Sequence, residues 1–369
     1  MVLGVDASRA VGRRTGVGRY LEHLLSAWSG RDLPFERVRV FSPAPLPGVA
    51  LGEPLRAEVL PSGSAGLRWQ ATRLRGAARG VDVLFSSYTL PPGFAGRSVV
   101  GNLGIYEGAL AIPGWRSRLH SRHMAWSARR ATRVIANSES TKADVVRFYG
   151  VAAERIDVVW PGVAPCFRPA GPDEAESLAG AAERWLGRRG PYLLFVGKLS
   201  ARRNVPALLQ ALASTRRSHP ELALLLVGPN TTGLPVAELA SEHGLDGAVR
   251  HVDHLDHEQL APLYRGALAF VLPTTHEGFS FTIPEALASG APVLTVEHAA
   301  LHEAGLAEAC LVVERPTPEA LAAALGRLVD EPALRETLGR RGLEAARSLS
   351  WDENARRTME VLSRVAGTG

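Results

Sequence analysis

Two glutamates stand eight residues apart in the stretch HEGFSFTIPEALASGAPVLT, residues 276–295. Glu277 lies in the loop after an apolar strand pattern, and Glu285 lies inside the helical pattern that follows. Glu285 has a structural interpretation, because TIPE, residues 282–285, fits a capping box with Thr282 as the N-cap. It also has a chemical interpretation, since a carboxylate at the end of a buried strand can accept hydrogen bonds from a ligand. The sequence leaves both open.

Three cations stand at another strand end, in the stretch FVGKLSARRN. Cations of a solvated surface would be scattered, whereas these lie between a buried strand and a helix. That position suits a diphosphate, for which each charge-assisted hydrogen bond contributes about 1.5–3 kcal/mol. The pattern favours a phosphate-binding role for Lys198 and Arg203 and a surface position for Arg202.

Two backbone segments could also approach an anion. Gly16 and Gly18 precede a helical run, where they either admit an anion to the backbone or shape a tight turn. The N–H groups of Gly278, Phe279 and Ser280 precede the helix that contains the second glutamate, and the dipole of that helix favours an anion. Neither GxGxxG nor GxxxxGK[ST] occurs in the chain, which argues against the common dinucleotide and phosphate loops.

The elements that would position these residues are short apolar strands alternating with helical patterns. In the first half, strands are predicted at residues 2–6, 37–41, 82–86, 98–102, 133–137 and 156–160. In the second half, they are predicted at residues 192–197, 222–228, 249–253, 268–272, 291–295 and 309–313. Continuous Val/Leu/Ile strands between helices indicate parallel sheets covered on both faces.

Two doubly wound domains follow from this pattern. We expect an N-terminal domain over residues 1–165, a Pro- and Gly-rich linker over 166–190 and a C-terminal domain over 191–351. Ligands of such folds bind beyond the carboxyl ends of the strands, so the site is expected in a cleft between the domains.

Composition excludes several classes of protein. The chain has 369 residues, of which 46% are hydrophobic, and no run approaches the roughly 18 apolar residues of a membrane helix. The start is polar by its sixth residue and does not read as a signal peptide, so a cytoplasmic location is expected. Cys166 and Cys310 have no zinc-type spacing, and neither a disulfide framework nor a metal site is indicated.

The modest net charge of +5 is concentrated in residues 114–133. The basic residues there are Arg116, Arg118, Arg122, Arg129, Arg130 and Arg133, interleaved with Trp115, Leu119, Met124 and Trp126. A solvated helix face is one interpretation. The other is attraction to the anionic inner face of a membrane or to a lipid-diphosphate acceptor. No recognised nucleic-acid module accompanies the charge, which disfavours nucleic acid as a partner.

The stretch EGFSFTIPE resembles the E-x7-E element of retaining glycosyltransferases with the GT-B fold, in the large family 4. TGVGRY near the start, VGKLSARRN and GAPVLT extend the resemblance over nearly the whole chain. It implies a GT-B fold of two Rossmann-like domains facing across a cleft, with the last helix, 352–369, packing back on the first domain. A nucleotide-sugar donor would bind mainly to the second domain and the acceptor to the first.

The resemblance also implies roles for single residues. Glu277 would contact the hexose hydroxyls and Glu285 the ribose, while Lys198 and Arg203 would bind the phosphates and act with Glu277 in catalysis. Lys198 replaces a more usual Arg, so it would act as a point charge rather than a fork. The backbone at 278–280 would bind the sugar and diphosphate, and Gly16 and Gly18 would close over the diphosphate.

On the acceptor side the chain departs from the family. Many relatives have a His-Asp pair after the fourth strand, but this region reads VVGNLGIYEGALAIPGW and has no His. Its polar residues are Asn102, Tyr106 and Glu107, which are the acceptor-side candidates. No Asp-x-Asp metal element occurs between the strands, which agrees with a metal-independent enzyme, and no cofactor is implied. In the family's retaining mechanism, the donor phosphate is thought to help deprotonate the acceptor.

The leading hypothesis is a metal-independent, retaining hexosyltransferase of polysaccharide biosynthesis that uses a UDP- or GDP-sugar. The start DASRAVGRRTGVGRY is similar to mannosyl- and rhamnosyltransferases, which points to GDP-mannose. The acceptor would be a saccharide, a lipid-linked sugar or a small molecule. Two alternatives stay open: a nucleotide-sugar epimerase or hydrolase of the same fold, and a non-catalytic nucleotide-sugar-binding subunit.

Overall fold

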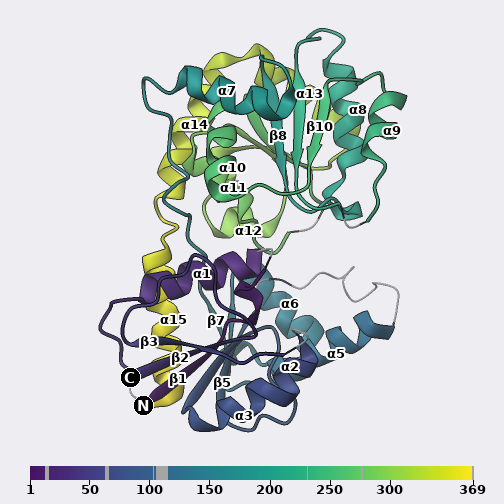
Figure 1. Cartoon of the computed structure of the whole chain (residues 1–369). Helices are drawn as coiled ribbons and strands as arrows, with labels where there is room; N and C mark the ends of the chain where they lie inside the picture. The colour runs from purple at the N-terminus through teal and green to yellow at the C-terminus, as the bar shows by residue number, and fades with distance from the viewer. Residues whose placement is uncertain are drawn as a thin grey trace. The chain divides into compact units, whose positions relative to one another are not determined.

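The computed structural model describes residues 1–12, 16–62, 66–102, 104, 115–230, 232–275 and 277–367. They form two compact units, one of Met1–Gly162 with Ser350–Gly369 and one of Val163–Leu349 (Figure 1). Each unit is a parallel sheet with helices, so the predicted pair of doubly wound domains is confirmed.

The first unit is built on a seven-stranded parallel sheet of order β3-β2-β1-β4-β5-β6-β7. Its strands are β1 (Val2–Asp6), β2 (Arg37–Ser42), β3 (Leu55–Val59), β4 (Val83–Ser87), β5 (Arg97–Asn102), β6 (Arg133–Ala136) and β7 (Ile156–Val158). Six of them match predicted strands. No strand was predicted at β3, because this edge strand reads LRAEV and buries only its first residue.

Helices cover this sheet. The longer ones are α1 (Gly16–Trp28), α5 (Trp115–Arg130), α6 (Glu139–Tyr149) and α15 (Trp351–Ala366). A further helical run comprises α2 (Leu67–Trp69), the π-helical segment η2 (Gln70–Leu74), α3 (Arg75–Ala77) and the 3-10 turn η3 (Ala78–Gly80). The unit also contains the 3-10 turns η1 (Ser8–Ala10) and η4 (Ala153–Arg155).

The last helix, α15, belongs to the first unit, as expected. Its Trp351 ring meets the edge of the Tyr20 ring at 5.6 Å, and the Trp28 indole on α1 donates to the Ala355 carbonyl at 3.0 Å. The chain leaves and re-enters the unit at one point, where a Cβ on Gly162 would lie 2.1 Å from the Trp351 nitrogen. Only glycine permits that approach.

The second unit has a six-stranded parallel sheet of order β10-β9-β8-β11-β12-β13. Its strands are β8 (Tyr192–Val196), β9 (Ala223–Val227), β10 (Val249–Val252), β11 (Ala269–Leu272), β12 (Val293–Val296) and β13 (Cys310–Val313), all at predicted positions. Its α-helices are α7 (Ala175–Leu186), α8 (Val205–Thr215), α9 (Val236–Glu242), α10 (His257–Gly266), α11 (Thr282–Ala288), α12 (Ala299–Glu303), α13 (Pro318–Asp330) and α14 (Pro332–Ala346). The 3-10 turns are η5 (Ala201–Arg203) and η6 (Ala307–Ala309). The segment predicted as a linker, 166–190, contains α7 and lies within the second unit.

The basic segment, residues 114–133, extends from a helix into the start of a strand. Its helix, α5, ends at Arg130, and Arg133 instead lies in β6, where it pairs with Asp157 at 2.5 Å. Met124 and Trp126 are partly buried against the core, whereas the Leu119 side chain is 50% exposed. Arg133 thus lies in the strand that was predicted over residues 133–137, and the other five arginines of the segment precede it. Over the parts of the chain described, no helix has the length and apolar character to cross a membrane.

Candidate functional site

The carboxyl end of β8 carries the predicted cations. The chain turns sharply there because the ends of β8 and β9 touch: a Cβ on Gly228, whose φ is +140°, would lie 2.1 Å from the Gly197 carbonyl oxygen. Lys198 follows with an exposed side chain that forms no ion pair within the described ranges. Arg203 ends the turn η5 and is buried. The same strand end therefore presents one solvated ammonium and one sheltered guanidinium.

Glu277 binds the guanidinium groups of this turn. Its Oε2 lies 2.6 Å from Arg203 Nη1 and accepts a hydrogen bond from Arg202 Nη1 at 3.0 Å. The Glu277 side chain is 3% exposed, so its charge is compensated by these two cations rather than by water. The predicted surface position of Arg202 is therefore wrong. Its contact with the predicted site residue could not be read from the sequence, since the two residues are 75 positions apart.

The backbone also joins the two segments. The amide of Thr275 donates to the Arg202 carbonyl at 2.8 Å, which fixes the loop after β11 to the turn after β8. Gly278, Phe279 and Ser280 follow in this loop and are buried. Because β8 and β11 are neighbours in the sheet, their carboxyl ends bring the cations and Glu277 together.

Glu285 does not close a capping box. The helix α11 begins at Thr282 with Phe281 as its N-cap, and no side chain caps it. The Tyr264 hydroxyl instead donates to Glu285 Oε2 at 3.2 Å, and His257 Nε2 lies 3.9 Å from Oε1. The structural interpretation of TIPE is therefore wrong, because the helix starts at Thr282 itself, one residue earlier than a Thr282 cap requires.

Two aromatic residues beside Glu285 were not predicted as part of the site. Tyr264 and His257 both lie on α10, and the ring of Phe167 meets each of them edge-on, at 5.6 Å and 5.0 Å. In the sequence, Tyr264 sits in an ordinary apolar helical pattern, LAPLYRGALAF, and no local signal separates it from core. Only the packing of α10 against α11 brings its hydroxyl to the carboxylate.

The predicted site residues of the first unit lie partly outside the described residues. Gly16 and Gly18 form the first turn of α1 rather than the loop before it, and Gly18 is buried. Asn102 is the last residue of β5. Tyr106 and Glu107 lie outside the described residues. Among the residues described, no group of three or more His, Cys, Asp or Glu is arranged to hold a metal ion.

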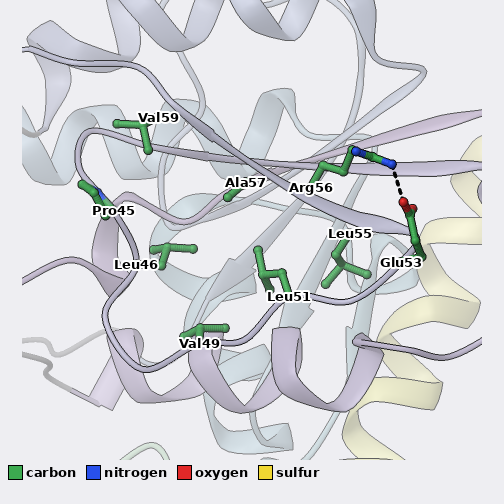
Figure 2. Close-up of a pocket in the computed structure, with 9 residues that line it drawn as sticks. All are labelled: Pro45, Leu46, Val49, Leu51, Glu53, Leu55, Arg56, Ala57 and Val59. Atoms are coloured by element: carbon green, nitrogen blue, oxygen red, sulfur yellow. Dashed lines mark hydrogen bonds and ion pairs between the residues drawn. The ribbon is translucent and has the colours of Figure 1, made fainter.

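A cavity of about 550 Å³ lies beside the edge strand β3 (Figure 2). Its lining residues are Pro45, Leu46, Val49, Leu51, Glu53, Leu55, Arg56, Ala57 and Val59. Most are aliphatic, and Arg56 pairs with Glu53 at the side of the cavity. None of the predicted site residues lines it.

Comparison with known proteins gives two family matches. The family described as Glycosyltransferase Family 4 matches residues 14–165, and Glycosyl transferases group 1 matches residues 186–345. A D-inositol 3-phosphate glycosyltransferase from Nocardioides sp. is 31% identical over 93% of this chain and 78% of its own length. Matches to further enzymes of that name cover 50–57% of those relatives.

Solved structures share the fold. Sucrose-phosphate synthase from Thermosynechococcus elongatus has a TM-score of 0.80 and 20% identity, with all of both chains covered. Anabaena HepE in complex with UDP-glucose has a TM-score of 0.76 and 16% identity, covering 98% of this chain and 99% of that one. At these identities the likeness concerns the fold, which is GT-B.

Proposed function

Since the chain belongs to these glycosyltransferase families, we propose that it is a retaining hexosyltransferase that uses a nucleotide-sugar donor. The observation that carries the proposal is the juxtaposition of Glu277 with Arg202 and Arg203 at the carboxyl ends of two neighbouring strands. A buried carboxylate with two guanidiniums contributes little to stability, because desolvation of the three charges offsets most of their attraction. The same group can bind a ligand that carries both hydroxyls and phosphates, since the carboxylate accepts from hydroxyls and the guanidiniums donate to phosphates.

The donor would use this charge arrangement as follows. Its diphosphate would bind Lys198 and Arg203 and so supply a second anion to the guanidinium that now faces Glu277. The Glu277 carboxylate could then accept hydrogen bonds from hexose hydroxyls. The buried backbone at Gly278, Phe279 and Ser280 would donate to the sugar and diphosphate, and the N-terminal turn of α1, with Gly16 and Gly18, would approach the phosphates from the first unit.

Glu285 would bind the ribose of the donor. Tyr264 donates to Glu285 Oε2, which orients the carboxylate, and carboxylate oxygens accept hydrogen bonds from sugar hydroxyls. The buried surroundings of Glu285 strengthen such hydrogen bonds relative to water.

In the proposed transfer, the acceptor hydroxyl oxygen bonds to the anomeric carbon while the bond from that carbon to the diphosphate oxygen breaks. Both events occur on one face of the sugar, which retains the configuration. The acceptor proton passes to the departing phosphate, and Lys198 and Arg203 stabilise the negative charge that develops there. No metal ion is required in this scheme.

The donor is proposed to be a UDP- or GDP-sugar. HepE was solved with UDP-glucose, whereas the N-terminal sequence pattern favours GDP-mannose. The acceptor is proposed from the name of the relative, which acts on D-inositol 3-phosphate. Saccharide and lipid-linked acceptors remain in the proposal, with Asn102, Tyr106 and Glu107 as candidates for contact.

The test combines UDP-glucose or GDP-mannose with D-inositol 3-phosphate, a malto-oligosaccharide or a lipid-diphosphate sugar, with and without EDTA. A glycosylated product whose anomeric configuration matches the donor supports the proposal. Nucleotide release without an acceptor indicates a hydrolase, an altered sugar indicates an epimerase, and binding without turnover indicates a non-catalytic subunit. Arg203→Met should abolish transfer. Arg189→Met is the matched control, because Arg189 pairs with glutamates at the exposed surface.

A further inference from the structure

Tyr88 has a backbone conformation that residues other than glycine rarely adopt. Its φ is 66°, and among the described non-glycine residues only Asn204 shares a positive value. The left-handed region costs an L-residue energy because its Cβ crowds the backbone, and Asn tolerates it better than Tyr. Glycine would occupy this position without strain. Residues held in this way cluster at binding sites, so the strained tyrosine calls for a functional explanation.

A buried polar network holds the turn that contains Tyr88. The carboxylate of Asp6, at the end of β1, is buried and accepts from Gln70 Nε2 at 2.9 Å and from the Ser8 amide at 3.0 Å. Ser86 Oγ lies 3.0 Å from the same carboxylate and 2.6 Å from the Thr89 carbonyl oxygen. The network therefore fixes the residues on both sides of Tyr88.

Further hydrogen bonds come from three other elements. Gln70, the first residue of the π-helical segment η2, also places Nε2 3.0 Å from Thr89 Oγ1. The Tyr88 amide donates to the Gly101 carbonyl on β5 at 2.8 Å, and the Leu90 amide donates to Ser127 Oγ on α5 at 2.9 Å. With so many partners the turn cannot relax, and the φ of Tyr88 is imposed by the fold.

Tyr88 lies where a doubly wound sheet binds ligands. In the sheet of the first unit, β1 lies between β2 and β4. From β1 the chain first adds β2 and β3 on one side, and it then crosses to the other side of β1 to add β4. The strand order therefore reverses between β1 and β4, and ligands of such sheets bind beyond the carboxyl ends of the strands at this reversal. Asp6 ends β1, and Tyr88 directly follows β4. Tyr88 is only partly buried, while Ser87 and Thr89 on either side of it are buried.

We propose that Tyr88 contacts the acceptor, with its ring against the C–H face of a sugar or cyclitol ring. This inference rests on the proposed transferase function and identifies a residue of the acceptor side that the sequence did not indicate. An aromatic ring with a hydroxyl tip matches a polyol ring, which has an apolar face and a polar rim. Asp6, Gln70, Ser86 and Thr89 are positioning residues, because they act by holding the turn.

The test replaces Tyr88 with Gly, Phe or Leu and measures the melting temperature, the dissociation constant of UDP or GDP, and the KM of the acceptor that supports transfer. Tyr88→Gly should raise the acceptor KM by at least about tenfold. Its melting temperature should equal or exceed that of the parent, since glycine relieves the strain. Nucleotide affinity should not change. Tyr88→Phe keeps the ring and should change the KM by less than about threefold, and Tyr88→Leu should resemble the glycine variant.

Phe148→Leu is the matched control, because Phe148 is a partly buried aromatic residue of the same unit that packs on the core. It should lower the melting temperature and leave the acceptor KM unchanged. An unchanged acceptor KM in Tyr88→Gly overturns the inference. So does a fall in the melting temperature of Tyr88→Gly, which would make Tyr88 a structural residue. Absence of any transfer by the parent protein is a separate result, which refutes the proposed function and this inference with it.

Discussion

Replacing Glu277 with Gln should destabilise the second unit. The stabilisation that a bound nucleoside diphosphate gives to the variant should be at least as large as in the parent. The change keeps the shape of the side chain and removes the charge that compensates two arginines. Glu277 is 3% exposed and Arg203 11% exposed, with 2.6 Å between Oε2 and Nη1. Arg202, 24% exposed, lies at 3.0 Å from the same oxygen.

The size of the effect follows from these distances. At an effective dielectric constant of about 20, unit charges roughly 4 Å apart attract by about 4 kcal/mol. Removing one partner of a buried pair costs about 3–5 kcal/mol. The glutamine oxygen still accepts a hydrogen bond and both arginines retain some contact with water, so we expect about 3 kcal/mol. For a unit of this size that corresponds to a fall in melting temperature of roughly 6–12 °C.

Differential scanning calorimetry of the full chain, with and without saturating UDP or GDP, measures the melting temperature and its increase on nucleotide binding. A ligand at 100 times its Kd stabilises the parent by about 2.7 kcal/mol. The variant should gain at least as much, because the phosphates replace the lost anion. Glu176→Gln is the control, since that carboxylate pairs with Arg189 at the exposed surface and its loss should barely change the melting temperature.

A second variant tests whether Arg202 and Arg203 are the counter-ions of Glu277. Arg202→Met should add little to the destabilisation that Glu277→Gln already causes, because the pair is then already broken. A melting temperature of Glu277→Gln within about 2 °C of the parent would show that Glu277 is not the counter-ion of these arginines. The charge argument for the site would then fail.

Three further outcomes are expected. Lys198→Ala or Arg203→Ala should weaken nucleoside-diphosphate binding in calorimetry by about 1.5–3 kcal/mol, and unchanged affinity in both would remove them from the phosphate site. Glu285→Gln should weaken donor binding by about 1–3 kcal/mol with little change in melting temperature, whereas equal loss of stability and affinity would indicate a structural role. If α5 meets anionic lipid, cosedimentation with phosphatidylserine vesicles should fall with salt and on replacement of its exposed Arg118 and Arg122, and no binding by the parent would refute this.

Some features of the fold could be predicted because they depend on local composition. Buried parallel strands read as continuous Val/Leu/Ile runs, and all but one of the strands were found in that way. The exception, β3, is an edge strand whose exposed residues break the run. Residues at strand ends were also accessible to prediction, since the carboxyl ends of parallel strands meet at one edge of a sheet. Lys198, Arg203 and Glu277 were proposed on that basis.

By itself, then, the sequence determined the class of fold and the strand ends at which charged residues gather, because hydrophobic runs record burial directly. It did not determine which groups meet across those ends. Arg202 was predicted to lie on the surface, and Tyr264 was not predicted as a site residue. Only the pairing of β8 with β11 and the packing of α10 on α11 bring them to Glu277 and Glu285. The conformation of Tyr88 was equally inaccessible, since residue type disfavours its φ and only hydrogen bonds from distant elements impose it. Contacts between residues far apart in the chain depend on tertiary packing, which local patterns do not encode.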